Sequence, residues 1–169
     1  MKFHHVLTSI VLSAAVWMSL STAAFAQADG QKSFDQLKSL AGSWQGTFEG
    51  KPVQATLRVT SMGNAIVHEM KGDGPEDPIT MFYLDGDRLV LTHYCDAGNR
   101  PRMAAKLSPD GKTLEFNFLD VANYSSKQEG HMQHAVFTFI DANHHTEDWT
   151  FMLEGKPDMK AHLDLQRIK

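Results

Sequence analysis

Polar and apolar residues alternate along most of the chain after residue 42, a pattern that is typical of β-strands. In LEFNF (114–118) the alternation is strict, and in MKAHLDL (159–165) the apolar residues all share one face. Such runs are separated by turn sequences rich in glycine, asparagine and aspartate, as expected for hairpins. The pattern predicts ten consecutive antiparallel strands, over residues 43–49, 52–60, 64–71, 78–84, 88–95, 101–107, 113–119, 132–140, 145–153 and 159–167.

A different spacing precedes the strands. In SFDQLKSL, the residues Phe34, Leu37 and Leu40 recur at helical intervals behind Ser33, a residue type that caps helix N-termini. Gly42 follows and can end a helix. The sequence therefore predicts a short helix over residues 33–41.

Ten short strands joined in series leave two exposed sheet edges unless the sheet closes on itself. We therefore expect an all-β fold, an antiparallel up-and-down β-barrel of about ten strands with a short N-terminal helix. At this strand number the interior is too wide for side chains alone to pack closely and can hold a small ligand.

The last hairpin but one tests the register of the barrel. A three-residue turn over 142–144 would pair Phe137 with Trp149, whereas a two-residue turn would pair Phe137 with Asp148. The three-residue turn keeps one face apolar, so we expect it. It also places Glu147 on that apolar face, where a carboxylate needs a partner or a raised pKa.

The first 26 residues have the composition of a signal peptide. Their only charged residue is Lys2, and the apolar stretch from Val6 to Leu20 is too short to span a bilayer comfortably as an anchor. Ala24 and Ala26 are the small residues that a signal peptidase reads, which predicts cleavage before Gln27. We expect residues 27–169 to be a single domain that is periplasmic or secreted and has no membrane anchor.

The charge of the mature chain argues against nucleic acid as a partner. One of the 16 Lys and Arg residues lies in the leader and none of the 20 Asp and Glu residues does, so the mature chain carries 15 against 20, a net charge of −5. With a single cysteine, Cys95, no intramolecular disulfide is possible. A chain of this length buries enough surface to be stable without one.

Three residues resemble the signature of a known superfamily: Gly42 and Trp44, directly after the predicted helix, and Arg167 in the last strand. This combination resembles the calycin superfamily, which contains lipocalins, fatty-acid-binding proteins and nitrobindins. The resemblance implies that Trp44 packs under the Arg167 guanidinium and joins the first strand to the last. The segments VTSMGNAIVHEM, FYLDGDRLVLTHY and DLQRIK resemble a family of secreted bacterial calycin-like barrels with no assigned function.

The resemblance to nitrobindins raises the question of haem, which they bind through a histidine just after a proline at the start of the last strand. Here the residue after Pro157 is Asp158. His162 lies four residues on, about 13 Å away along a strand. We therefore expect no haem and no other cofactor.

The stretch LTHYCDAGNRPRM, residues 91–103, is the main candidate for chemistry. His93 and Cys95 are two apart on one strand and share its inward face with Leu89 and Leu91. They could act as a nucleophile pair, but a buried inert thiol beside a satisfied histidine is the more ordinary arrangement.

Arg100 and Arg102 follow in the same stretch, and two arginines can hold an anionic ligand at the rim of the barrel. The alternative is that they form ion pairs with nearby acids. We expect an arginine, His93 or a ligand to be the partner of Glu147; alternatively, the carboxylate lies at the open mouth of the barrel.

The candidate ligand-binding residues are therefore His93, Cys95, Arg100, Arg102 and Glu147, with no residue assigned a catalytic role. The histidine spacings do not predict a metal site, and no phosphate-binding loop or hydrolase motif is present. The sequence favours a protein that binds a small apolar or amphipathic, possibly anionic, ligand. The alternatives are a hydrolase or isomerase that uses Glu147 and His93, and a structural envelope protein with a filled barrel. The oligomeric state stays open.

Overall fold

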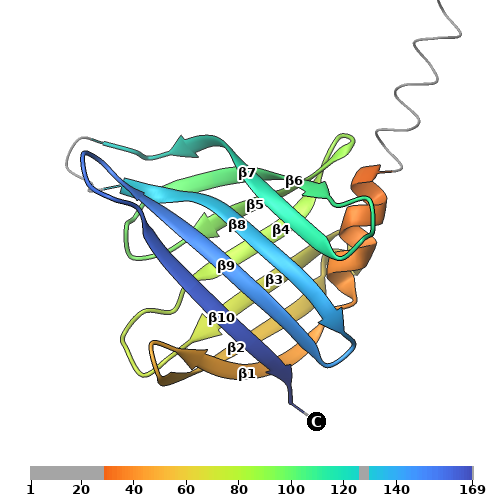
Figure 1. Ribbon diagram of the computed structural model, residues 1–169. Coiled ribbons are helices and arrows are strands. Elements are labelled where there is room, and N and C mark those ends of the chain that lie inside the picture. Colours follow the sequence, from red (N-terminus) through yellow and green to blue (C-terminus); the bar gives the residue numbers. More distant parts are fainter. Residues whose placement is uncertain (1–28, 126–129, 169) are drawn as a thin grey trace, which may run out of the picture.

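Ten antiparallel strands close into a barrel in the computed structural model, which describes residues 29–125 and 130–168 (Figure 1). Each strand is hydrogen-bonded to its neighbours in sequence, and β1 pairs with β10 to close the ring. The expected all-β, ten-stranded up-and-down barrel is confirmed. The strands are β1 (Gly42–Phe48), β2 (Lys51–Thr60), β3 (Ala65–Lys71), β4 (Ile79–Asp85), β5 (Arg88–Tyr94), β6 (Arg100–Leu107), β7 (Thr113–Ala122), β8 (Gly130–Asp141), β9 (His144–Leu153) and β10 (Met159–Arg167).

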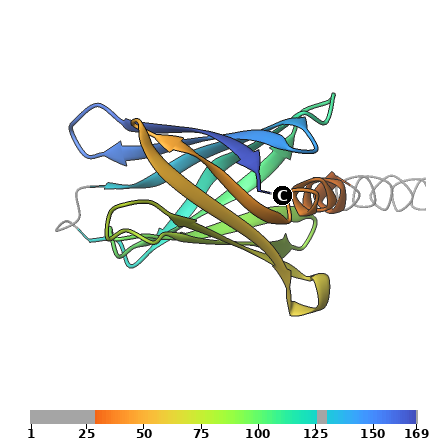
Figure 2. The same cartoon turned by 90° about the horizontal axis from the view of Figure 1, so that it is seen from below.

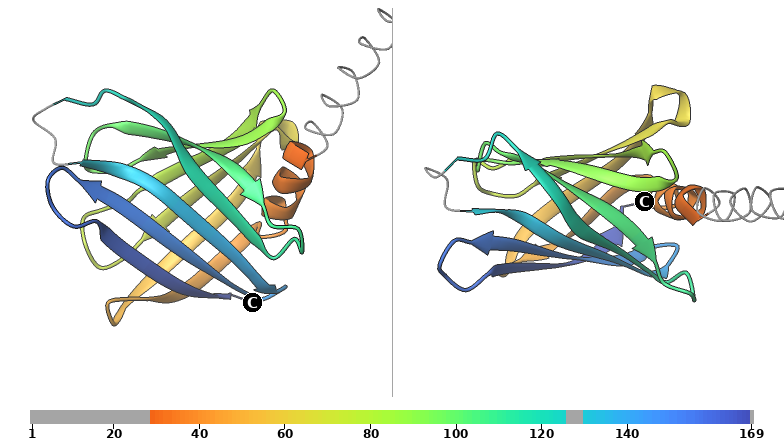
Figure 3. Two further views of the ribbon diagram at one scale, coloured as in Figure 1. Left: turned by 45° about the horizontal axis from the view of Figure 1, so that its top comes forward. Right: turned by 90° about the horizontal axis from the view of Figure 1, so that it is seen from above.

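The N-terminal helix packs across one end of the barrel, as the views in Figures 2 and 3 show. Its described part covers residues 29–38, so the predicted helix, 33–41, began and ended too far toward the C-terminus. Ser33 is not the N-cap that we expected, because it lies inside the helix and its hydroxyl donates to the Asp29 carbonyl at 2.8 Å. The apolar face was predicted correctly, since Phe34, Leu37 and Leu40 are all buried.

Trp44 and Arg167 meet where the first and last strands pair. They are directly opposite in the β1–β10 register, and the guanidinium carbon of Arg167 lies 4.1 Å from the centroid of the Trp44 ring. Arg167 also donates to the carbonyl oxygens of Ser39 and Ala41, at the end of the helix. A side chain at Gly42 would lie 2.5 Å from this guanidinium, which explains the glycine at that position. The contact expected from the sequence is therefore present.

The β8–β9 hairpin corrects the predicted register. Asp141 pairs with His144 across a two-residue turn, and a register shift lies between Phe139 and Asp141. Phe137 consequently faces Glu147 and not Trp149. Because the error is two residues, the faces are unchanged, and Glu147 does point inward as expected.

The interior next to the helix is filled by side chains. Trp44, Phe82, Phe116 and Phe137 are each fully buried and belong to one continuous cluster that includes the apolar face of the helix. The expectation that ten strands leave too wide an interior is therefore wrong for this part of the barrel. Four large aromatic rings supply the volume that smaller side chains would leave empty.

The two ends of the barrel differ. The helix end contains the helix, the short β4–β5 and β8–β9 turns and the C-terminus of β10. The loop end contains the connections at 72–78, 95–99 and 154–158, together with residues 123–125 after β7. Inward-facing residues near the loop end, among them Met70, Met132 and Ala161, are only partly buried.

The predicted leader, residues 1–26, lies outside the described residues. Within the described part of the chain, no helix is long and apolar enough to span a membrane.

Candidate ligand-binding site

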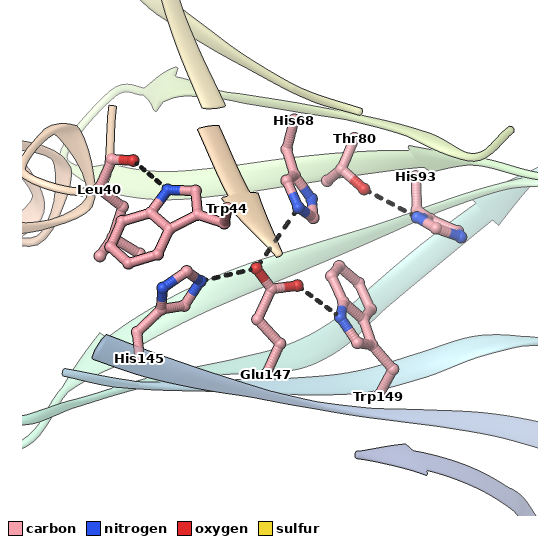
Figure 4. A network of polar contacts seen from close by, with 8 residues as sticks. All are labelled: Leu40, Trp44, His68, Thr80, His93, His145, Glu147 and Trp149. Atoms are coloured by element: carbon pink, nitrogen blue, oxygen red, sulfur yellow. Dashed lines mark hydrogen bonds and ion pairs between the residues drawn. The ribbon is translucent and has the colours of Figure 1, made fainter. Parts of the chain in front are cut away.

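A buried polar cluster lies in the middle of the barrel and is centred on Glu147 of β9. Alternation along β9 points His145, Glu147 and Trp149 inward, and each is at most 2% exposed. The His145 Nε2 atom lies 3.1 Å from Glu147 Oε1, and Trp149 Nε1 donates to Glu147 Oε2 at 3.0 Å (Figure 4). One strand thus supplies the carboxylate and a polar partner for each of its oxygens.

His68 reaches the same carboxylate from β3, on the other wall of the barrel. Its Nε2 atom lies 3.4 Å from Glu147 Oε1 but makes no hydrogen bond within the described residues. His68 is 1% exposed and packs among the rings of Phe82, Phe137 and Trp149. The cluster therefore ties the two walls together across the interior.

The surroundings of Glu147 favour its ionised form. Burial raises the pKa of the carboxyl, but the nearby His68 and the hydrogen bonds from His145 and Trp149 outweigh burial and hold this pKa below its usual value. Burial also lowers the pKa of His68, against the attraction of Glu147. A buried anion is thus held by ring nitrogens and has no contact with solvent.

His93 lies beside this cluster, on the side away from the helix. His68, Thr80 and His93 are neighbours across β3, β4 and β5, and Thr80 Oγ1 is 2.8 Å from His93 Nδ1. The His93 ring also packs on Trp149, with 5.2 Å between centroids. Figure 4 shows the second ring nitrogen of His93 pointing away from Thr80 and from the Glu147 cluster.

His93 is neutral at ordinary pH. Burial, reinforced by the nearby His68, lowers its pKa to about 4. A neutral imidazole has one donor nitrogen and one acceptor nitrogen. Because Nδ1 is engaged with Thr80, the other ring nitrogen, which makes no hydrogen bond among the described residues, offers a single uncharged hydrogen-bonding position.

The strands β7 and β8 separate toward the loop end. They pair only from Thr113 to Asn117 on β7, although β7 continues to Ala122. In the space between them, the ring of His131 stacks on Phe118 with 4.6 Å between centroids. Phe118 is 41% exposed, so an apolar surface is accessible where the two strands diverge.

The two arginines that we proposed for an anionic ligand lie outside the barrel. Arg102 points outward, because it alternates with the inward Pro101 and Met103. It forms a bidentate ion pair with Asp120 of β7. Arg100 is exposed and donates to the Gly98 carbonyl at 3.0 Å. Neither lies beside His93 or Glu147, because alternation along β6 turns both away from the interior.

Cys95 follows β5 directly and is half-buried. Burial raises the pKa of its thiol, against a backbone hydrogen bond from Ala97 that lowers it. The thiol form of cysteine is a poor nucleophile. The sequence favoured a buried inert thiol; the thiol is half-buried, and its role stays a prediction.

The structure thus brings together two of the five predicted site residues, His93 and Glu147, on either side of the Trp149 ring. The expected partner of Glu147 was an arginine, His93 or a ligand, but its neighbours are His68, His145 and Trp149. A signal was present: His145, Glu147 and Trp149 are spaced by two in a strand, so all three had to share the face assigned to Glu147. No local pattern identified His68, whose strand lies opposite β9.

The position that nitrobindin-like haem binding would require is held by an exposed carboxylate. Asp158 lies before β10 and accepts a hydrogen bond from Gln133 at 2.9 Å. It does not supply the ring nitrogen that this mode of haem binding needs, so the residue does not fit. His162 points outward and pairs with Asp148 at 2.6 Å. In residues 29–125 and 130–168, no three His, Cys, Asp or Glu side chains are grouped so that they could hold a metal ion.

Comparison with solved structures identifies a protein of similar architecture. The crystal structure of Rv2717c from M. tuberculosis superposes with a TM-score of 0.60 at 13% sequence identity, covering 81% of this chain and 98% of that one. At this identity the similarity concerns the fold alone. No family model and no curated protein matches the sequence.

Proposed function

We propose that the protein binds a small, uncharged amphipathic molecule in the loop-end half of the barrel, with His93 as its polar contact. The observation that carries the proposal is the placement of His93. It is an inward histidine held in one orientation by Thr80 and Trp149, with its other nitrogen turned toward the less tightly packed half.

The side chains around that half support an apolar body for the ligand. Met70 lies one inward position beyond His68 on β3, and Met132 faces Phe151 across β8 and β9. The side chains of Met70, Met132 and Phe151 are only partly buried. Methionine side chains adapt their shape to a bound apolar group. A pocket with mostly apolar walls and a single polar group is typical of small-molecule sites.

The charges support an uncharged polar group on the ligand. His93 is neutral at ordinary pH because burial lowers its pKa to about 4, and the anionic Glu147 lies just beyond Trp149. A carboxylate placed there would lose its hydration without gaining a cation. A hydroxyl or a carbonyl can use the one free position of His93.

The same geometry gives little support to an enzyme that uses Glu147 and His93 together. The Trp149 ring contacts both, and its nitrogen is bonded to the carboxylate. Glu147 is 0% exposed and already has partners for both oxygens, so it is not placed to take a proton from a substrate.

We also propose that the protein is a calycin-type barrel that works in the periplasm or outside the cell. The stacking of Arg167 on Trp44 and the closed ten-stranded ring support the first part. The composition of residues 1–26 supports the second.

A pair of probes with the same chain and different head groups tests the proposed function. Dodecanol and dodecanoate are titrated at pH 7 against wild type, His93→Leu and Arg102→Ala, and binding is followed by calorimetry. We expect dodecanol to bind wild type more tightly than dodecanoate. Removing one hydrogen bond in His93→Leu is expected to weaken dodecanol binding about tenfold.

Arg102→Ala is the control, since Arg102 lies on the outer face, and it should bind dodecanol like wild type. Tighter binding of dodecanoate that is lost in Arg102→Ala would favour the anionic ligand and contradict the proposal. Equal dodecanol binding by wild type and His93→Leu, with unchanged melting temperatures, would also contradict it.

A further inference from the structure

The outer surface of the barrel carries a groove that is separate from the interior. It has a volume of about 320 Å³ and is formed by residues of β10, β1 and β2. Its walls include Gln45, Gln54 and Gln166, and Gly46 and Pro52 also line it. An inference about this groove does not depend on the proposed interior site.

The three glutamines form one row across three adjacent strands. In the strand pairing, Gln45 is directly opposite Gln54 on one side and Gln166 on the other. All three side chains are exposed. Neighbouring strands are about 4.8 Å apart, so the row extends over about 10 Å.

The amide groups in this row are available for binding. Among the described residues, the side chains of Gln45 and Gln54 make no hydrogen bond, and Gln166 makes a long one of 3.5 Å to Asp164. Each amide has two N–H donors and a carbonyl acceptor. The row therefore offers donors and acceptors side by side without a net charge.

Gly46 lines the groove with its backbone alone, because it lies on the inward face of β1, opposite the buried Leu165. A Cβ atom at this position would lie 2.1 Å from the Asp164 carbonyl oxygen, so no larger residue fits between β1 and β10. Pro52 adds an apolar ring surface beside it. Charged side chains flank this neutral stretch: Lys71 lies opposite Gln54, and Asp164 lies opposite Thr47.

We propose that this groove binds a neutral saccharide chain. Sugar hydroxyls both donate and accept, which matches the paired capacity of the amides, and the C–H face of a sugar ring can cover the apolar surface of Pro52. The length of the row is one that a disaccharide unit covers. A charged polymer would leave the amides without a matching charge and would meet both Lys71 and Asp164.

Isotope-labelled protein titrated with oligosaccharides tests this proposal. The probes are maltohexaose, cellohexaose and chitohexaose, with a hexamer of galacturonate as the charged comparison. We expect at least one neutral hexamer to shift backbone amide signals in β1, β2 and β10 and not those around His93. The Gln45→Ala, Gln54→Ala double variant should weaken that binding about tenfold through the loss of two amide contacts.

Asn117→Ala is the matched control, because Asn117 is also an exposed amide but lies on β7. It should bind the sugar like wild type. The proposal is contradicted if no neutral hexamer shifts these signals at concentrations up to about 10 mM, where even weak sites are occupied. It is also contradicted if only the galacturonate hexamer binds, or if the folded double variant binds as wild type does.

Discussion

The helix half and the loop half of the barrel interior are built from the same ten strands but packed in different ways. In the helix half, Trp44 is fully buried, bonded through its ring nitrogen to the Leu40 carbonyl and covered by Arg167. In the loop half, Met70 and Met132 point inward and remain partly exposed. The buried Glu147 cluster lies between the two.

We propose that this difference separates stability from binding within one barrel. Rigid aromatic rings hold the strands together at the helix end, and the Glu147 cluster joins the walls of the barrel beside them. At the other end, Met70 and Met132 are only partly buried, and methionine side chains can adapt their shape to a neighbouring group.

The largest effect is expected for Trp44→Ala. The change removes a fully buried ring and its hydrogen bond, and leaves Arg167 without its stacking partner. We expect a loss of about 3 to 5 kcal/mol in the free energy of unfolding, measured by denaturant melts of the mature protein. Met132→Ala, in the loop half, should cost no more than about 1 kcal/mol because its side chain is already partly exposed. Similar losses for both variants would remove the distinction between the two halves.

A somewhat smaller effect is expected for Glu147→Ala, which leaves His145 and Trp149 without their buried acceptor. Unpaired buried donors cost about 1 to 3 kcal/mol each, so we expect a loss of about 3 kcal/mol in the same melts. Glu147→Gln should destabilise the protein less than Glu147→Ala, because the amide keeps one acceptor oxygen for Trp149 Nε1 and replaces the other oxygen with an N–H₂ group. Wild-type stability of Glu147→Gln would show that the carboxylate is not needed as the common acceptor.

The third effect is a dependence of stability on pH. The pKa of His93 is lowered to about 4 by burial, and burial also lowers that of His68, so between about pH 6.5 and pH 4 the unfolded chain binds protons that the folded one does not. Stability is therefore complete above about pH 6.5 and falls as the pH decreases, by up to about 1.4 kcal/mol per pH unit for each histidine.

Denaturant melts across this pH range measure the slope of the free energy of unfolding against pH. His93→Gln should lower the number of protons taken up on unfolding, which this slope reports, by about one. An unchanged slope in His93→Gln would show that His93 is not held neutral by the fold.

The sequence predicted most of the architecture because the relevant signals are local. Alternation and turn residues define each strand, and Trp44 and Arg167 lie at fixed places in the first and last strands. The start of the helix was missed because Ser33 offers a cap-like side chain although it lies within the helix. The hairpin register was missed because the shift near Ile140 leaves no mark in the pattern of polar and apolar residues.

The site was less accessible to sequence reasoning because it depends on contacts across the barrel. His68 meets Glu147 only because β3 and β9 face each other over the filled interior. Arg102 was expected to contact a ligand, but on the outer face its cross-strand neighbour Asp120 accepts two hydrogen bonds from the guanidinium. A second register shift, next to Arg102, determines that pairing. No feature of the sequence predicted this shift.

Trp44 and Trp149, the two tryptophans among the described residues, report on the two halves separately and give the most direct test of binding in the loop half. In a ¹H–¹⁵N spectrum, the indole signals of Trp44 and Trp149 can be assigned with Trp44→Phe and Trp149→Phe and followed while dodecanol is added. We predict that the Trp149 signal shifts together with the ring signals of His93, and that the Trp44 signal stays in place. Binding in the loop half would be contradicted if the Trp44 signal shifted without the Trp149 signal, or if neither signal shifted at saturating dodecanol.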